Sequence, residues 1–495
     1  MNIRSKFLFA MLATAMLGAC SDETKQVAEP QQAAPEEAVQ VAPASVESVQ
    51  GSSDVFVHLF EWRWPEIAAE CEDFLGPNGY VAVQVSPPQE HIQGPQWWTR
   101  YQPVSYKIES RGGTRIEFAD MVKRCKSAGV DIYVDAITNH MADVTPGTGV
   151  AGSEFGNYVF PVPYGYDDFH HCGRNGDGRI ADYQDLWEVR NCNLGTLADL
   201  DTSNPAVQKK ISAYLNDLLS LGVAGFRLDA IKHVQQDEVN QILSQLDSSP
   251  FIYQEVPDPG SEPINSMDYL INGSVVEFKY PNELASAFLA ARLDSLSDLG
   301  SGAGYLPANH AVVFVDNHDT QRGHGAVDRI LNYKSTELYD LANVFMLGWP
   351  YGYPKVMSSY RFEGGSQGPP GTKPVETGTC SSDWVCEHRR PSRLGMIKFR
   401  KATEGAPVTN WQAFGEELIS FGRGDRGHVV INIGSETVDG TFITSMAPGE
   451  YCNVVSGGVP ENDCNGAVVR VGDDGVLQIS VPPGSAVAIH HNALK

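Results

Sequence analysis

The most constraining feature of the sequence is a regular alternation of short apolar runs and amphipathic segments that begins at residue 54. This alternation predicts parallel strands, because parallel neighbours are joined by long crossover connections that are usually helical. The eight candidate strands are 55–60, 81–86, 131–139, 225–230, 251–256, 274–278, 311–317 and 355–359. Eight such units predict an α/β fold, a closed (β/α)8 TIM barrel.

Amphipathic stretches between these runs supply the expected crossover helices. The clearest are residues 65–75, 117–128, 204–221 and 336–347. Asn204 followed by Pro205 is typical of a helix start, since Asn caps free amide groups and proline fits the first turn.

Two regions depart from the alternation, and a chain of 495 residues is longer than one hydrophobic core usually organises. Residues 141–198 carry few helix signals and are too long for an ordinary connection, so we expect an inserted subdomain after the third strand. Beyond residue 404 the pattern changes to β-runs at 418–422, 428–433 and 476–481. We therefore expect a barrel from 54–140 and 199–404, the insert, and an antiparallel β-sandwich domain at 405–495.

The start of the chain predicts export. Arg4 and Lys6 precede an apolar stretch, residues 7–17, that is too short to span a bilayer and is typical of a signal peptide ending at residue 19. The run Leu17-Gly18-Ala19-Cys20 resembles the lipobox of bacterial lipoproteins, which implies lipidation of Cys20, and Ser21 resembles their outer-membrane sorting pattern. Residues 20–53 lack aromatics and predict a flexible tether, so membrane contact is expected through the lipid anchor only, on the periplasmic face or at the cell surface.

Nine cysteines leave an even set of eight once Cys20 is set aside. Disulfides persist in the oxidising compartments that exported proteins reach. Among the many possible pairings, we favour those in which each bridge stays within one local unit. We expect bridges Cys172–Cys192, Cys380–Cys386, Cys452–Cys464 and Cys71–Cys125. Metal binding by these cysteines is the weaker reading, because no Cys-x-x-Cys pair occurs.

The charge balance argues against nucleic-acid partners. Asp and Glu number 61 against 36 Lys and Arg, a net charge of −25 that repels phosphate backbones. The 8 Trp and 19 Tyr offer flat stacking surfaces suited to a neutral ligand such as a sugar. We expect a monomer.

Four predicted strands end in polar side chains, the place where barrel active sites are built. These runs are DIYVDAITNH (131–140), GFRLDAIKH (225–233), FIYQEV (251–256) and FVDNHD (314–319). One such acid often only caps a helix, but four strand ends together indicate catalysis.

These four runs resemble the signature regions of the alpha-amylase family of glycoside hydrolases. Further runs, HLFEWRW, VQVSPPQEH, WWTRYQPVSY, FVDNHDTQRGHG and KVMSSYR, resemble its chloride-dependent, animal-type branch. The likeness covers residues 54–495. It implies Asp229 as nucleophile, Glu255 as general acid/base and Asp319 as the third carboxylate, which holds the sugar and stabilises the transition state.

The resemblance also implies substrate-binding positions around these acids. It implies histidines that bind sugar hydroxyls, aromatic and amide side chains that stack on or hydrogen-bond the sugar, and neighbouring subsites. The residues concerned are His140, His318, Trp97, Trp98, Tyr101, Gln102, Lys232 and His233.

A chloride activator is implied at Arg227, Asn317 and Lys355. Because strand side chains alternate, Arg227 and Asp229 point to the same face, and the cation is expected to keep the nucleophile ionised. A chloride near Glu255 would in turn keep that residue a proton donor. Lysine stands at 355 where the family commonly has arginine, so we expect weaker chloride binding and partial activation.

A structural calcium ion is implied at Asn139, Arg190, Asp199 and His233, through two side-chain oxygens and two backbone carbonyls. The run Asn175-Gly176-Asp177-Gly178 lacks the remaining ligands of a calcium loop and predicts a turn.

Three functions fit the sequence. The first is endo-acting, retaining hydrolysis of internal alpha-1,4-glucosidic bonds in starch, glycogen and maltooligosaccharides. A related transglycosylase or oligosaccharide glucosidase would use the same acids, and only its products differ. A surface glycan-binding lipoprotein without turnover is the third, and the complete acid set speaks against it.

Overall fold

The computed structural model describes residues 53–325, 327–457 and 464–495. The expected signal peptide, Cys20 and nearly all of the tether lie outside these residues. Within them, no helix combines the length and apolar character needed to cross a membrane.

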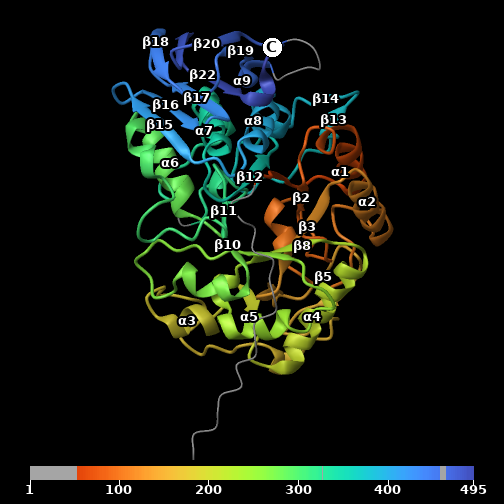
Figure 1. Cartoon of the computed structure of the whole chain (residues 1–495). Coiled ribbons are helices and arrows are strands. Elements are labelled where there is room, and N and C mark those ends of the chain that lie inside the picture. Colours follow the sequence, from red (N-terminus) through yellow and green to blue (C-terminus); the bar gives the residue numbers. More distant parts are fainter. Residues whose placement is uncertain (1–52, 326, 458–463) are drawn as a thin grey trace, which may run out of the picture. The chain divides into compact units, whose positions relative to one another are not determined.

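Eight parallel strands close into a barrel, as the sequence predicts (Figure 1). They are β1 Phe56–Leu59, β2 Ala82–Val85, β3 Asp131–Ile137, β8 Gly225–Asp229, β9 Phe251–Gln254, β10 Ser274–Val276, β11 Ala311–Val313 and β12 Tyr353–Ser358. Going round the barrel, the order is β1-β12-β11-β10-β9-β8-β3-β2. Each expected run contains or overlaps one of these strands.

The strand register places the polar strand ends side by side. Asp135 of β3 pairs with Arg227 of β8, and Ile137 pairs with Asp229. Leu228 of β8 pairs with Gln254 of β9, and the Glu255 amide donates to the Leu228 carbonyl at 3.0 Å. Asp229 and Glu255 therefore leave neighbouring strands at the same, carboxyl end of the barrel.

Helices surround the barrel in the expected places. The α-helices outside the insert and the C-terminal domain are α1 Trp64–Glu70, α2 Arg115–Ser127, α4 Pro205–Ser220, α5 Gln236–Leu243, α6 Lys279–Leu289, α7 Thr336–Gly348 and α8 Pro391–Ala402. Asn204 caps α4 by accepting from the Ala206 amide at 2.9 Å, with Pro205 in the first turn. The helix expected at 65–75 is α-helical to Glu70 and continues as a π-helix, η1 Cys71–Leu75.

Short 3-10 helices connect many of these elements. They are η2 Trp97–Tyr101, η3 Tyr166–Asp168, η4 Ile231–His233, η5 Ser266–Asn272, η6 Leu293–Asp298, η7 Thr320–Arg322, η8 Tyr333–Ser335, η9 Glu387–Arg389 and η10 His491–Ala493. One of them, η4, follows almost directly after barrel strand β8.

The segment between β3 and α4 forms a small unit of its own. Its strands are β4 His140–Asp143 paired with β7 Leu197–Asp199, and β5 Gly147–Thr148 paired with β6 Glu154–Phe155. One short helix, α3 Leu186–Asn191, precedes β7. Tyr164 and Phe169 are buried in this segment and supply part of its apolar core.

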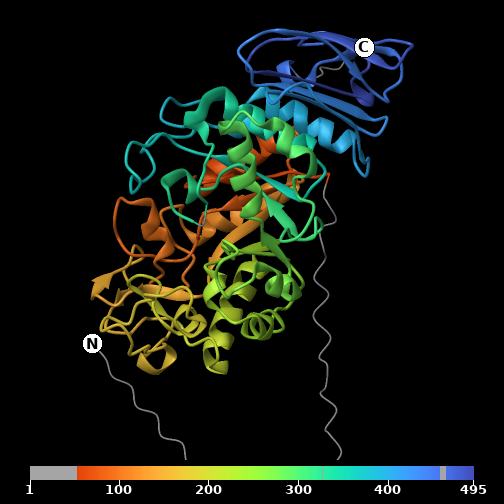
Figure 2. The same cartoon turned by 90° about the vertical axis from the view of Figure 1, so that its left-hand side faces the viewer.

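Beyond α8 the chain is nearly all β. One antiparallel sheet contains β15 Val408–Ala413, β16 Leu418–Arg423, β17 Gly427–Asn432 and β22 Ser485–His490, and the other contains β18 Val438–Ile443, β19 Gly449–Cys452, β20 Val468–Val471 and β21 Val476–Val481. Apolar side chains from both sheets, including Val430 and Phe442, pack in one cluster, as expected for a sandwich. Figure 2 shows the strands of this domain in blue. A short helix, α9 Val454–Gly457, and the hairpin β13 Val375–Glu376 with β14 Thr379–Cys380 complete the described elements.

Four disulfides join the expected pairs. Cys71–Cys125 links η1 to α2, and Cys172–Cys192 closes a loop within the insert. Cys380–Cys386 and Cys452–Cys464 are the other two. Each bridge therefore stabilises a local unit.

Candidate active site

A cleft of about 530 Å³ opens at the carboxyl ends of the barrel strands. It is lined by three acids that the sequence placed on separate strand ends, Asp229, Glu255 and Asp319, together with histidines and aromatic side chains. All three acids come from different strand-to-helix connections, which is how a barrel brings distant segments to one site.

Arg227 lies beneath the cleft and binds two of these acids. Its Nη1 is 2.7 Å from Asp229 Oδ1, and its Nη2 is 2.6 Å from Glu255 Oε1. Nη1 also lies 2.5 Å from Asp135 Oδ1 on the neighbouring strand. One buried guanidinium thus fixes the positions of Asp229 and Glu255 relative to each other through charge-assisted bonds.

The residue after Asp229 contributes a second anchor. Ala230 has φ 49°, a left-handed conformation that is unusual for a residue with a Cβ. In this conformation its amide donates to Glu255 Oε2 at 2.9 Å. Strained backbone of this kind clusters at functional sites, and here it holds the second oxygen of Glu255.

Asp319 follows β11 and sits beside His318. His318 Nε2 lies 3.3 Å from Asp319 Oδ2, and the ring of His318 stacks on Tyr101 with centroids 5.0 Å apart. Asn317 supports the turn, because its Oδ1 accepts from the Asp319 and Thr320 amides at 2.9 and 2.8 Å.

Burial dominates the acidity of the cleft. It raises the pKa of Asp229 well above its usual range, although Arg227 acts in the opposite direction. Arg227 therefore acts in the direction that the sequence predicts, favouring the ionised form of Asp229, while burial opposes it. Burial, with Glu255 as a neighbouring charge, raises the pKa of Asp319 to about 7.

The predicted sugar-binding residues divide into two groups. Trp97, Trp98, Tyr101 and His140 line the cleft. Gln102 does not belong to the lining, and its Oε1 instead lies 3.4 Å from the Asp143 amide. The structure therefore places Gln102 in support of the insert and brings the aromatic side chains to the cleft.

Lys232 and His233 also line the cleft. Lys232 Nζ donates to the Pro257 carbonyl at 2.7 Å and pairs with Glu262. His233 Nδ1 bonds to the Val189 carbonyl at 2.8 Å, and burial lowers the pKa of this imidazole to about 4, so it is neutral near pH 7.

Sequence reasoning missed several residues of the same cleft. They are Tyr183, Leu194 and Leu197 of the insert, Glu262 after β9, and His324 after β11. None ends an apolar strand, so the periodicity gave no signal for them. A possible signal was the aromatic and apolar content of the insert close to the predicted mouth of the barrel.

Comparisons with known proteins agree with this geometry. Residues 86–259 match the family described as alpha amylase, catalytic domain, and residues 409–492 match alpha amylase, C-terminal all-beta domain. Human alpha-amylase 1B is 44% identical, over 91% of this chain and 96% of its own length. An alpha-amylase from Thermomonospora curvata is 43% identical, over 90% of this chain and 74% of its own length.

Solved structures give the same result. Wild-type alpha-amylase I from Eisenia fetida superposes with a TM-score of 0.85 at 39% identity, covering 90% of this chain and 99% of that one. A mutant of that enzyme in complex with maltohexaose has a TM-score of 0.84.

The chain belongs to the alpha-amylase family.

Two of the positions that the resemblance implies for chloride, Arg227 and Lys355, are joined by a buried hydrogen-bond network. Lys355 Nζ donates to Gln84 Oε1 at 3.2 Å, and Gln84 in turn donates to Asp135, the partner of Arg227. Burial, together with the charge of Arg227, lowers the pKa of Lys355 to about 7. Arg227 and Lys355 therefore belong to one buried polar network, in which Arg227 is bound to the carboxylates of Asp135, Asp229 and Glu255.

The calcium positions also lie near one another in this amylase-family chain. Asp199 pairs with His140 across β4 and β7, and the Leu200 amide donates to the Asn139 carbonyl at 3.0 Å. The bond between His233 and Val189 holds η4 against α3, which carries Arg190. Among the described residues no group of three His, Cys, Asp or Glu forms a metal cluster. The implied calcium site has only one carboxylate, together with one side-chain amide and two backbone carbonyls, so it is not a cluster of that type. Its oxygen ligands fit the preference of calcium.

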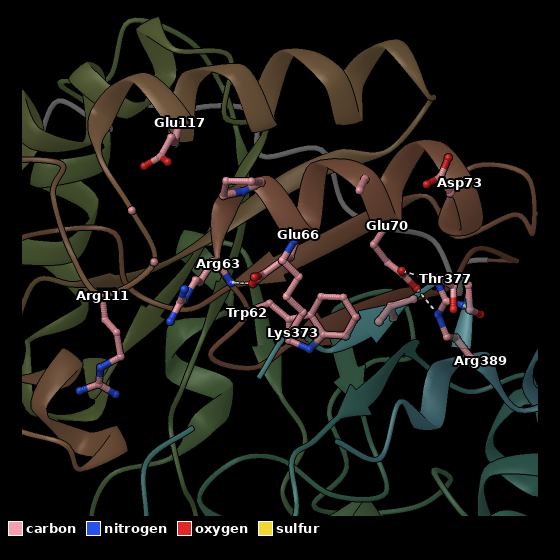
Figure 3. A pocket seen from close by; sticks show the side chains of 16 residues that line it. Trp62, Arg63, Glu66, Glu70, Asp73, Arg111, Glu117, Lys373, Thr377 and Arg389 are labelled. Atoms are coloured by element: carbon pink, nitrogen blue, oxygen red, sulfur yellow. Dashed lines mark hydrogen bonds and ion pairs between the residues drawn. The ribbon is translucent and has the colours of Figure 1, made fainter. Parts of the chain in front are cut away.

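A second cavity, of about 690 Å³, lies beside α1 and does not contain the amylase acids (Figure 3). Its described lining includes Trp62, Arg111 and Lys373, and Glu70 forms an ion pair with Arg389 at 2.5 Å across one end. None of the predicted site residues belongs to that lining. The volume of a cavity therefore does not identify the active site in this protein. The cleft is identified by the titratable side chains that converge in it.

Proposed function

We propose that this protein is an alpha-amylase that hydrolyses internal alpha-1,4-glucosidic bonds of starch, glycogen and maltooligosaccharides with retention of configuration. The observation that carries the proposal is the attachment of Asp229 and Glu255 to one guanidinium in a cleft that also contains Asp319. Two carboxyl groups held close together on either side of a glycosidic bond are the requirement for retaining cleavage.

In the first step Glu255 donates a proton to the glycosidic oxygen while Asp229 attacks the anomeric carbon. The bond to the leaving sugar breaks, and a covalent bond forms between Asp229 and the remaining glycan. Arg227 holds Oδ1 of Asp229, which leaves the other carboxylate oxygen for the attack.

In the second step Glu255, now ionised, takes a proton from a water molecule. The water oxygen attacks the anomeric carbon, the bond to Asp229 breaks, and the sugar is released with its original configuration. The Ala230 amide and Arg227 bind the ionised form of Glu255 that this step requires.

Asp319 and the cleft histidines position the sugar at the cleavage point. Because the pKa of Asp319 is raised to about 7, both its protonated and ionised forms are accessible near neutral pH. The neutral His318 beside it offers a hydrogen-bonding nitrogen, since burial lowers the pKa of this imidazole. These groups bind sugar hydroxyls more strongly as charge develops on the ring.

Two ions complete the proposal. Calcium would be held by Asn139 and Asp199 side chains with the Arg190 and His233 carbonyls, and it would link the insert to the barrel. Chloride would be held by Arg227, Asn317 and Lys355, and a bound anion supplies negative charge that favours the protonated general acid. We further propose a monomer that is exported and tethered to the outer membrane through lipidated Cys20.

A starch digest tests the enzymatic proposal. Rapid loss of iodine staining, with few new reducing ends and mixed maltooligosaccharides of alpha configuration, is the result expected for endo-acting retaining hydrolysis. Longer glucans would indicate a transglycosylase, and glucose alone would indicate a glucosidase. Starch binding without reducing sugar would overturn catalysis in favour of a glycan-binding protein.

A further inference from the structure

We infer that Trp187 on α3 is an additional glucan-binding position, where a polymer chain leaving the cleft stacks on the free face of the indole ring. The inference rests on the proposed function and extends it to a surface outside the cleft lining.

Trp187 is unusually exposed for its size. Its exposed fraction is 43%, and the two other large apolar side chains of this segment, Tyr183 and Leu186, are exposed by 39% and 40%. Tryptophan is usually covered on most of its surface, so an exposed ring beside a binding site indicates a contact surface.

An arginine stacks on the ring of Trp187, which is still 43% exposed. The Arg174 guanidinium lies 3.9 Å from the ring centroid, and Arg174 Nη1 is bonded to Asp185 Oδ2 at 2.7 Å. Asp185 also caps α3 by accepting from the Trp187 amide at 2.9 Å. The stacked arginine covers one face of the indole and restricts its motion, so the other face is preorganised for a ligand.

The surface is continuous with the substrate cleft. Tyr183, four residues before Trp187, lines the cleft, and Lys232 Nζ lies 5.6 Å from its ring centroid. Gln184 Nε2 donates to the Ser261 carbonyl at 2.9 Å, which ties the segment to the loop carrying Glu262, another cleft residue. Lys232 and Tyr183 therefore adjoin at the cleft, and Trp187 follows Tyr183 on the same segment of the insert.

The chemistry of the surface selects a glucan. A glucose ring presents C–H groups on its faces, and the electron-rich face of an indole attracts them. Polymer chains cleaved at internal bonds extend beyond the cleft, whereas short oligosaccharides do not. Trp187 should therefore matter more as the substrate becomes longer.

The test compares kcat/KM on amylose with kcat/KM on a chromogenic maltotrioside. In Trp187→Ala we expect the ratio of kcat/KM on amylose to kcat/KM on the maltotrioside to fall about two- to tenfold, the range for one aromatic stacking contact. The fall should come from a higher KM for amylose. Trp187→Phe should restore most of the ratio. Phe414→Ala, which removes another aromatic side chain that is 43% exposed but lies next to β15 in the C-terminal domain, should leave the ratio at the wild-type value.

Two results would overturn the inference. One is an unchanged ratio in Trp187→Ala, and the other is an equal loss on both substrates that Trp187→Phe does not restore, which would show a structural role of α3. A wild-type protein inactive on both substrates would instead refute the proposed function, so the two failures are distinguishable.

Discussion

Arg227 Nη2 lies 2.6 Å from Glu255 Oε1, so the proposed proton donor is held in an ion pair beneath the cleft. A carboxyl group must carry a proton to act as the general acid of the first step and must be ionised to act as the general base of the second. Catalysis therefore depends on how tightly Arg227 holds Glu255 at each stage.

Replacing Glu255 with glutamine should remove the proton donor and leave the cleft intact. For Glu255→Gln we expect at least a ~10²-fold loss of kcat on starch, the usual contribution of general acid catalysis. Glu262→Gln is the matched control, because Glu262 lines the same cleft but pairs with Lys232 instead of Arg227. Reducing-sugar release measures both variants, and a similar loss in the two would contradict the assignment of Glu255.

Chloride should raise activity by competing for Arg227. An anion near the guanidinium weakens its contact with Glu255, and its negative charge favours the protonated general acid. We expect kcat on starch to rise on adding chloride at constant ionic strength, with only partial activation because Lys355 lacks the planar fork of arginine. Equal rates with chloride and with a bulky organic anion would refute the chloride site.

The chloride response should depend on pH through Lys355. Burial and the charge of Arg227 lower the pKa of Lys355 to about 7, while Asp135, Glu255 and Asp319 act in the opposite direction. The protonated form of Lys355 attracts an anion, and it predominates below the pKa. Above about pH 7, chloride binding therefore requires that Lys355 also take up a proton. The apparent chloride affinity is therefore expected to fall as pH rises through this value.

Lys355→Arg is the matched variant for this pH effect. Arginine stays protonated across the range, so chloride activation should persist at pH values where the wild type loses it. Activity titrations with chloride on both sides of neutrality measure the apparent affinity. Identical pH dependence in the two proteins would show that another group controls the response.

The sequence predicted the barrel and its acids because both depend on local periodicity. An apolar run such as 225–230 becomes β8, and the residue that ends it, Asp229, reaches the cleft by the geometry of the barrel alone. Three disulfides followed from pairing cysteines that are neighbours in the sequence, and Cys71–Cys125 was the pair that remained; the structure shows all four bridges.

The rest of the site depends on tertiary contacts that periodicity does not encode. Tyr183 reaches the cleft because the adjoining Gln184 is tied to Ser261, 77 residues away. The pKa of Asp229 depends on burial and on the charges of Glu255 and Asp135 as well as on Arg227, which is the one neighbour that strand periodicity points to. Both features become visible only when the fold is complete.

Calcium should stabilise the junction between the insert and the barrel. Burial raises the pKa of Asp199 to about 6, and His170 Nδ1 lies 2.7 Å from its Oδ2. A bound cation would stabilise the charge of this buried carboxylate, which has lost its contact with water. A ligand that binds only the folded protein stabilises it by about 2.7 kcal/mol at 100 times its Kd. We expect EDTA to lower the Tm of the wild type by several °C, and calcium to restore it.

Asp199→Asn tests whether this stabilisation comes from the proposed site. The variant keeps the shape of the side chain and removes its negative charge, so the difference in Tm between EDTA and calcium should shrink to near zero. Asp177→Asn is the control, because Asp177 lies in the exposed turn at 175–177, where its carboxylate accepts from the Arg179 amide at 3.1 Å and pairs with the Arg179 side chain at 3.5 Å. Differential scanning fluorimetry with and without calcium gives the comparison. A calcium effect that survives in Asp199→Asn but disappears in Asp177→Asn would place the ion at the turn and refute the site at the insert.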